Sequence, residues 1–298
     1  FGGGGSTVGG NLAATATTGN MTDNNDGSVT VAGTSSFTTS ANNATITLDD
    51  TDHSFTGAVT ITTNDNSGMD ADVTIDGGTT ALILAASTID GDLTVRSGNA
   101  SGIIDSGTVT VGGNLAATTD ANNGVINLGT LAVNGTIAVV TNGTGNATVV
   151  NDEDVNFAAS TVGGALSATA TTGDIVDSGA LTIAGTSTFI TGANGSDIIL
   201  DSSANAFSGA VNFQADDGSE TFGNITLVDS GAIKLHSGNN ALDFDGANDF
   251  VDIGDFSWGG SSSFASWVKF DAKPHWARIF DFAQGQADDN FILSLKSN

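Results

Sequence analysis

The sequence has no cysteine and few basic residues. The absence of cysteine among its 298 residues excludes a disulfide scaffold, a thiolate zinc site, an iron–sulfur cluster and a cysteine nucleophile. Six lysines and arginines stand against 33 acidic residues, so the formal net charge is -27. A field this negative attracts metal cations and repels phosphate backbones and anionic lipid headgroups. We therefore expect neither nucleic acid nor a bare membrane as a partner.

Helix-forming residues other than alanine are also scarce. Only two of the acidic residues are glutamate, Glu153 and Glu220, and the single proline is Pro274. The chain is rich in Thr, Val and Ile, which favour strands, and in Asn, Asp and Gly, which favour turns. Its longest apolar run, residues 81–86, is far too short to cross a membrane. The composition predicts an all-β protein with no membrane-inserted segment.

A short motif recurs through residues 1–233. It consists of an apolar residue, any residue, a glycine, a small or polar residue and a second apolar residue. The motif glycines occupy positions 10, 33, 57, 91, 113, 135, 164, 185 and 209. Each unit also carries a second alternating apolar run after an Asn, Asp or Gly corner. Such units predict a β-solenoid of roughly nine or ten coils, with about 22–24 residues and two or three short strands per coil.

The coils are grouped into longer repeats. Residues 6–19 return almost unchanged as residues 160–173, and the coils that follow both copies come in the same order. We predict super-repeats of three coils that start near residues 6, 87 and 160, of which the middle one is degenerate. A rod tolerates such duplication because its coils touch only their neighbours, whereas an enzyme needs one unique cleft.

The composition changes near residue 234. Before this point the only basic residue is Arg96, while the other five basic residues, the three tryptophans and the proline all follow. We predict a β-solenoid domain over 1–233, a junction over 234–240 and a second domain over 241–298.

The first domain resembles the repeats of filamentous-haemagglutinin-type bacterial exoproteins. The resemblance is carried by runs such as residues 86–95 and 177–186 and covers about residues 1–233. It implies a right-handed parallel β-helix that forms the stalk of a large adhesin. It also implies an extracellular or bacterial cell-surface location, associated with the outer membrane. In that family, ligands bind to particular loops or inserted domains, so the repeats imply an architecture and no ligand.

The second domain resembles the opening strands of a laminin-G-like, concanavalin A-like jelly roll. The resemblance is carried by residues 241–253, 263–270, 278–282 and 290–295. It implies a partial antiparallel β-sandwich, because such a domain needs more residues than 241–298 supply. It further implies binding of glycans or protein partners, sometimes through calcium. We therefore expect the chain to be a fragment of a longer protein.

Candidate binding residues lie in this second domain. Asp243, Asp245 and Asp249 supply the hard oxygen ligands that calcium prefers, while the alternative is that these Asp-rich pairs simply turn the chain. No other cofactor is predicted. Trp258 in a Gly-flanked loop and Trp276 next to the proline are candidates for stacking on sugar rings.

Candidate catalytic residues are few. His53, His236 and His275 lie in different parts of the chain and form no metal-binding pair, so each is predicted to be a surface or packing residue. Arg96 is the only cationic group of the rod available as the base of a polysaccharide lyase, and glutamate for a carboxylate pair is nearly missing. We predict that the chain is not an enzyme.

These patterns predict a fragment of a large bacterial cell-surface or secreted adhesin, with a β-helical stalk that presents a lectin-like or protein-binding domain. Its partners would be glycans or surface proteins of a host or neighbouring cell. Two alternatives stay open. One is a glycan-binding lectin-like protein whose rod is only a spacer, and the other is a carbohydrate-active β-helix enzyme.

Overall fold

The computed structural model describes residues 4–23, 27–64, 70–215 and 223–235, together with the backbone of 278–282 and 291–294. The chain divides into two compact units, Phe1–Gly254 and Asp255–Asn298. Every element in the described residues is a β-strand. No helix in this part of the chain is long and apolar enough to cross a membrane.

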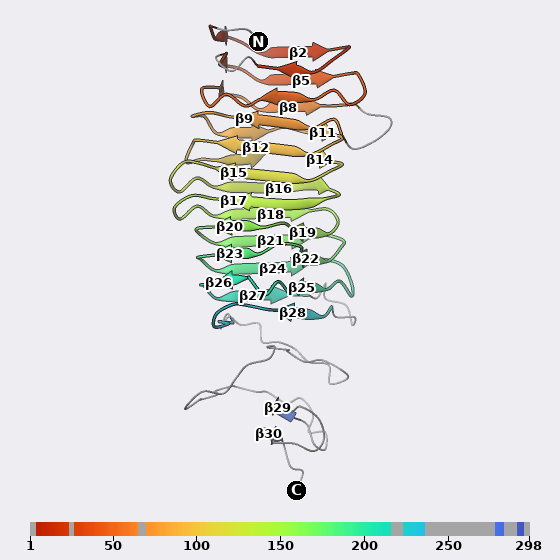
Figure 1. The fold of residues 1–298 in the computed structure, drawn as a ribbon, viewed down its shortest axis with the longest axis vertical. Helices are drawn as coiled ribbons and strands as arrows, with labels where there is room; N and C mark the ends of the chain where they lie inside the picture. Colours follow the sequence, from red (N-terminus) through yellow and green to blue (C-terminus); the bar gives the residue numbers. More distant parts are fainter. Residues whose placement is uncertain are drawn as a thin grey trace. The chain divides into compact units, whose positions relative to one another are not determined.

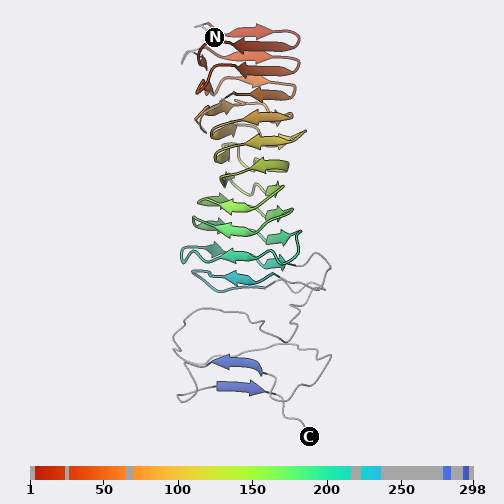
Figure 2. The same ribbon diagram turned by 90° about the vertical axis from the view of Figure 1, so that its right-hand side faces the viewer.

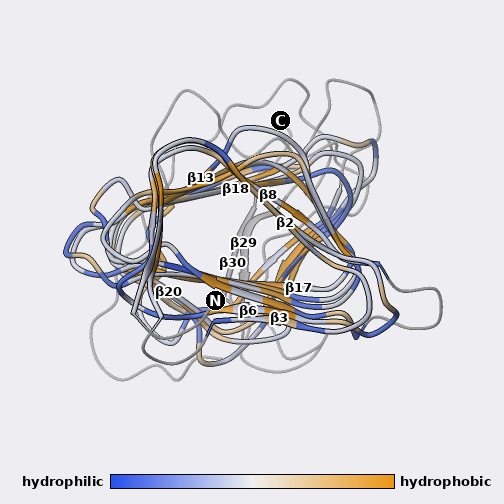
Figure 3. Ribbon diagram, turned by 90° about the horizontal axis from the view of Figure 1, so that it is seen from above, coloured by the Kyte–Doolittle hydropathy of each residue, from blue (hydrophilic) through white to orange (hydrophobic). Residues whose placement is uncertain are grey.

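The first unit is a parallel β-solenoid of about nine turns (Figures 1 and 2), as predicted. Strands within the stack pair in parallel with strands of the preceding and following coils, and those at the end of a sheet pair on one side only. The view along the stack in Figure 3 shows two facing walls. These walls are sheets B and C, whose strands are given in the next paragraph. Sheet A contains β1 (Ser6–Val8), β4 (Val29–Val31) and β7 (Ser54–Phe55).

Sheets B and C contain the other strands of the solenoid. The twelve strands of sheet B are β2 (Leu12–Ala16), β5 (Ser35–Thr39), β8 (Val59–Thr62), β10 (Leu82–Leu84), β11 (Ser87–Ile89), β13 (Ile103–Asp105), β14 (Val109–Val111), β16 (Ile126–Val133), β18 (Ala147–Asn151), β21 (Leu166–Ala170), β24 (Ser187–Thr191) and β27 (Val211–Gln214). The thirteen strands of sheet C are β3 (Met21–Thr22), β6 (Ile46–Leu48), β9 (Val73–Asp76), β12 (Leu93–Ser97), β15 (Leu115–Thr119), β17 (Thr136–Val140), β19 (Val155–Phe157), β20 (Ser160–Val162), β22 (Ile175–Asp177), β23 (Leu181–Ile183), β25 (Ile198–Leu200), β26 (Ala206–Phe207) and β28 (Ile225–Leu227).

The motif glycines form ladders from coil to coil. The amide of Gly185 donates to the carbonyl of Gly164 in the preceding coil at 2.9 Å, and Gly57 bonds to Gly33 in the same way at 3.1 Å. A Cβ on Gly185 would lie 2.5 Å from the carbonyl carbon and oxygen of Gly164. Gly185 has no positive φ, so the position requires glycine because two backbones approach closely.

Inward-facing side chains make one continuous apolar core. Strands alternate between buried and more exposed residues, as in β5 and β24, which is the period of a sheet with one buried face. Phe189 is fully buried and its ring contacts those of Phe157, Phe207 and Phe213, with centroids 6.5, 6.0 and 5.8 Å away. Burying one such side chain stabilises the fold by about 1.5–3 kcal/mol.

The super-repeat is longer than the three coils predicted from the sequence. The strand that follows the motif glycine belongs to sheet B in the first super-repeat (β2, β5), to sheet C in the second (β12, β15) and to sheet B again in the third (β21, β24). The strand after the motif glycine changes from sheet B to sheet C because β10 and β11 both pair with β8. The next strand, β12, then pairs with β9 and continues sheet C. In the same way, β19 and β20 both pair with β17. Each super-repeat therefore adds about half a coil to the three full ones.

The second unit is described only by its backbone at β29 (Arg278–Phe282) and β30 (Phe291–Ser294), which form an antiparallel pair. The rest of the predicted sandwich, and most of the predicted junction at 234–240, lie outside the described residues. The sandwich, the domain boundary and the right-handed sense of the solenoid stay predictions.

Candidate functional site

The outer face of sheet B carries a regular row of threonines. Thr15, Thr38, Thr62, Thr88 and Thr110 follow one another in register on sheet B, one per coil. They alternate with core residues along their strands, so their hydroxyl and methyl groups face outward. The carboxylates of the rod gather instead at the corners between strands.

Corner Asp and Asn side chains link one coil to the next. In one ladder, Asp72 Oδ1 accepts the N–H of Asp92 at 2.8 Å, Asp92 Oδ1 accepts the N–H of Asn114 at 2.7 Å, and Asn114 Oδ1 accepts the N–H of Thr136 at 2.9 Å. A second ladder runs through Asp154, Asp174, Asp197 and Asn224. These side chains satisfy corner amides that the sheets leave unpaired. Among the described residues, no three His, Cys, Asp or Glu side chains are arranged to hold a metal ion.

A buried Asp–His pair lies at one corner of the first super-repeat. His53 is fully buried, in line with the predicted packing role, and its Nε2 lies 2.9 Å from Asp23 Oδ2. Its Nδ1 accepts the backbone N–H of Val29 at 2.9 Å. Because the amide can only donate, the neutral ring carries its proton on Nε2 and donates it to Asp23. Both ring nitrogens are occupied, so His53 has no free lone pair with which to act as a general base.

Arg96 is held between two carboxylates. Its guanidinium bonds both oxygens of Asp120 at 2.9 and 3.0 Å, and its Nε lies 3.9 Å from Asp76 Oδ2. Burial raises the pKa of Asp76, although a hydrogen bond from the Gly78 amide and the charge of Arg96 act in the opposite direction. The arginine is thus part of a structural ion pair, which does not favour its use as a lyase base.

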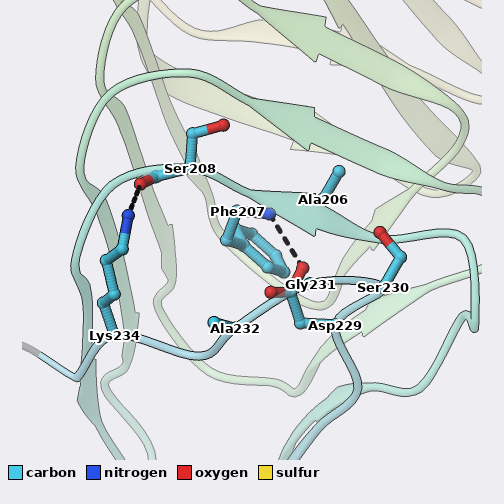
Figure 4. Close-up of a pocket in the computed structure, with 8 residues that line it drawn as sticks. All are labelled: Ala206, Phe207, Ser208, Asp229, Ser230, Gly231, Ala232 and Lys234. Atoms are coloured by element: carbon cyan, nitrogen blue, oxygen red, sulfur yellow. Dashed lines mark hydrogen bonds between the residues drawn. The ribbon is translucent and has the colours of Figure 1, made fainter.

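A pocket of about 270 Å³ lies at the last described coil (Figure 4). Lys234 Nζ donates to the carbonyl of Ser208 at 2.8 Å, and Asp229 Oδ1 accepts the N–H of Phe207 at 2.9 Å. Asp229 Oδ2 is buried and has no hydrogen-bond partner. The lining consists of Ala206, Phe207, Ser208, Asp229, Ser230, Gly231, Ala232 and Lys234. Its described lining residues include two serines and no histidine.

The sequence-predicted binding residues fall outside the described part of the chain. This applies to Asp243, Asp245, Asp249, Trp258 and Trp276, so calcium and sugar binding stay predictions. The Asp23–His53 pair was missed in turn, because the two residues are 30 positions apart and belong to no short motif. The signal available in the sequence was the internal repeat, in which His53 and Asn205 occupy equivalent positions of the first and third super-repeats.

A family model described as repeats of unknown function (DUF5649) matches residues 3–62, 70–128 and 144–214, which together make up more than half of the chain. All three stretches lie in the solenoid unit. Neither the curated proteins nor the solved structures gave a match.

Proposed function

The chain belongs to the family of repeats of unknown function (DUF5649), and from this premise we propose that it is a stalk segment of a large bacterial cell-surface or secreted adhesin. The observation that carries the proposal is the uniformity of the rod. β1 to β28 stack in parallel around one apolar core, and the same glycine corner returns in coil after coil. Continuous ladders of paired backbone groups resist proteases and extend in length by simple repetition.

The proposal includes the finer features implied by the resemblance to filamentous-haemagglutinin-type exoproteins, namely a right-handed β-helix and a location outside the cell. It also assigns no catalysis to the rod. In its described residues the supporting observations are the two occupied nitrogens of His53 and the carboxylate-bound guanidinium of Arg96.

Residues 241–298, as the beginning of a laminin-G-like domain, would then bind the glycan or protein partner. What supports this assignment is the change of composition, which concentrates tryptophan and basic residues after residue 234. Aromatic side chains are common anchors in glycan and protein interfaces. The rod would hold this domain away from the cell surface.

The test is binding of the full chain to glycan arrays and to bacterial or host cells, with calcium and with EDTA. We expect Trp258→Ala or Trp276→Ala to abolish binding. Thr62→Ala and Thr88→Ala, matched changes on the exposed face of sheet B, should leave it intact. Loss of binding in the two threonine variants would overturn the stalk assignment. Release of reducing ends or unsaturated uronate from a polysaccharide would overturn the absence of catalysis.

A further inference from the structure

One corner of the first super-repeat has an internal counterpart in the third super-repeat, in which an amide replaces the imidazole. In the third super-repeat, Asn205 takes the place of His53. Asn205 is also fully buried, its Oδ1 accepts the N–H of Leu181 at 2.8 Å, and its Nδ2 donates to Asp177 Oδ2 at 2.6 Å. Leu181 and Asp177 correspond in the repeat to Val29 and Asp23.

The supporting contacts of the two corners also match. Asp23 Oδ2 accepts the N–H of Asp50 at 3.1 Å, and Asp177 Oδ2 accepts the N–H of Ser202 at 3.4 Å. Three bonds are therefore common to the two corners, while Asp177 Oδ1 also accepts the N–H of Asp201 at 2.9 Å. The two corners differ in that an imidazole can take up a second proton between about pH 5 and 8, whereas an amide cannot.

We propose that His53 makes the first super-repeat sensitive to acid, while Asn205 leaves the third super-repeat insensitive. The second proton must bind Nδ1, because Nε2 already carries one. The Nδ1–H then faces the N–H of Val29, so two donors oppose each other and the hydrogen bond between them is lost. The contact with Asp23 persists as an ion pair. Acid therefore loosens the link between β4 and the residues just before β7, without removing the aspartate that holds the corner.

Charged side chains contact His53 or belong to the same corner. Asp23 touches Nε2, and Asp76 interacts electrostatically with His53 from β9. The carboxylate of Asp50 accepts the N–H of Asp52 at the same corner. Among the described residues, Asp23 and Asp76 interact with the ring, and Asp50 and Asp52 belong to the same corner. Arg96 offsets Asp76 and is itself paired with Asp120.

The test is amide hydrogen exchange of the full chain at pH 7.5 and pH 5.0, followed residue by residue and corrected for the intrinsic exchange rate. We expect the protection of the Val29 amide to fall about tenfold on acidification, the size set by one lost hydrogen bond. The protection of Leu181 in the same molecule should stay constant. Unchanged protection of Val29, or an equal fall at Leu181, would overturn the proposal.

Exchanging the two side chains supplies the matched controls. His53→Asn copies the Asn205 corner, and His53→Gln keeps a longer reach to Asp23; in both, the acid response of Val29 should disappear. Asn205→His should transfer the response to Leu181. If both His53 variants keep the fall at Val29, a neighbouring carboxylate causes it and the assignment to His53 is wrong. If Asn205→His does not fold, wild type and the His53 variants still decide the question.

Discussion

Replacing a ladder glycine tests the close backbone contact that defines each coil. In Gly185→Ala the new Cβ would lie 2.5 Å from the carbonyl carbon and oxygen of Gly164 and 2.7 Å from the nitrogen of Ala165. All three atoms belong to the backbone, so no side-chain rotation relieves the overlap. The two coils must separate at this corner, which also stretches the 2.9 Å hydrogen bond between Gly185 and Gly164.

The expected cost follows from these two effects. Overpacking of a tight site costs about 1–3 kcal/mol, and a weakened backbone hydrogen bond costs about 1 kcal/mol more. The lower chain entropy of alanine in the unfolded state offsets about 0.4–1 kcal/mol. We therefore expect Gly185→Ala to lower the free energy of unfolding by about 2 kcal/mol.

Gly10→Ala is the matched control, because it changes the same motif position where no atom lies within 4 Å of the new Cβ. Only the unfolded-state effect remains, so this variant should equal wild type or gain up to about 1 kcal/mol. Urea unfolding followed by circular dichroism gives the global effect. Since long repeat arrays can unfold in parts, amide exchange in β21 and β24 gives the local one. If Gly185→Ala is as stable as Gly10→Ala, the added Cβ does not force the two coils apart, and the argument that close backbone contact requires glycine at this position is wrong.

Three further outcomes are expected from substitutions in the rod. Phe189→Ala should lower the free energy of unfolding by about 3–5 kcal/mol, because the ring is fully buried among other phenylalanines; a loss below about 1 kcal/mol in urea unfolding would contradict this packing. Burial raises the pKa of Asp76, so its stabilising contribution is complete below the unfolded-state pKa and is lost as the pH rises through the folded-state pKa. Asp76→Asn, which can still accept the Gly78 N–H, should therefore gain stability relative to wild type as the pH rises through the folded-state pKa of Asp76, and parallel pH profiles would refute this. Arg96→Met should cost no more than about 1 kcal/mol, since the pair with Asp120 is half-exposed, and added salt should reduce that cost.

The coil itself was predictable because its cause is local in the sequence. Gly33 and Gly57 recur at the coil spacing since each must let the backbone of the neighbouring coil approach. Residues such as Val29 and Val31 alternate with polar residues because one face of each strand is buried. These two patterns are sufficient to predict a solenoid and its coil length.

The extra half-coil was not predictable in the same way. The spacing of 34 residues between Gly57 and Gly91 marks extra residues in this unit. Residues 82–84 and 87–89 resemble the short strands of other units, however, so the sequence does not indicate how these strands stack. Their effect depends on stacking: β10 and β11 both pair with β8, and the strand that follows must then enter the opposite sheet. Which sheet a strand joins is decided by the coils already in place, which no local pattern describes.

The corner bonds follow a different rule from sheet membership. The Val29–His53 bond lies beside sheet A, while the Leu181–Asn205 bond lies beside sheet C. Three bonds are nevertheless common to the two corners. The shared hydrogen bonds are therefore determined by the repeat sequence and do not depend on the sheet to which the strands of the repeat belong. Each corner needs only the coil next to it, because a solenoid is stabilised between nearest neighbours. A titratable side chain at one copy of a corner can then change that coil contact alone, while the other copies keep their bonds.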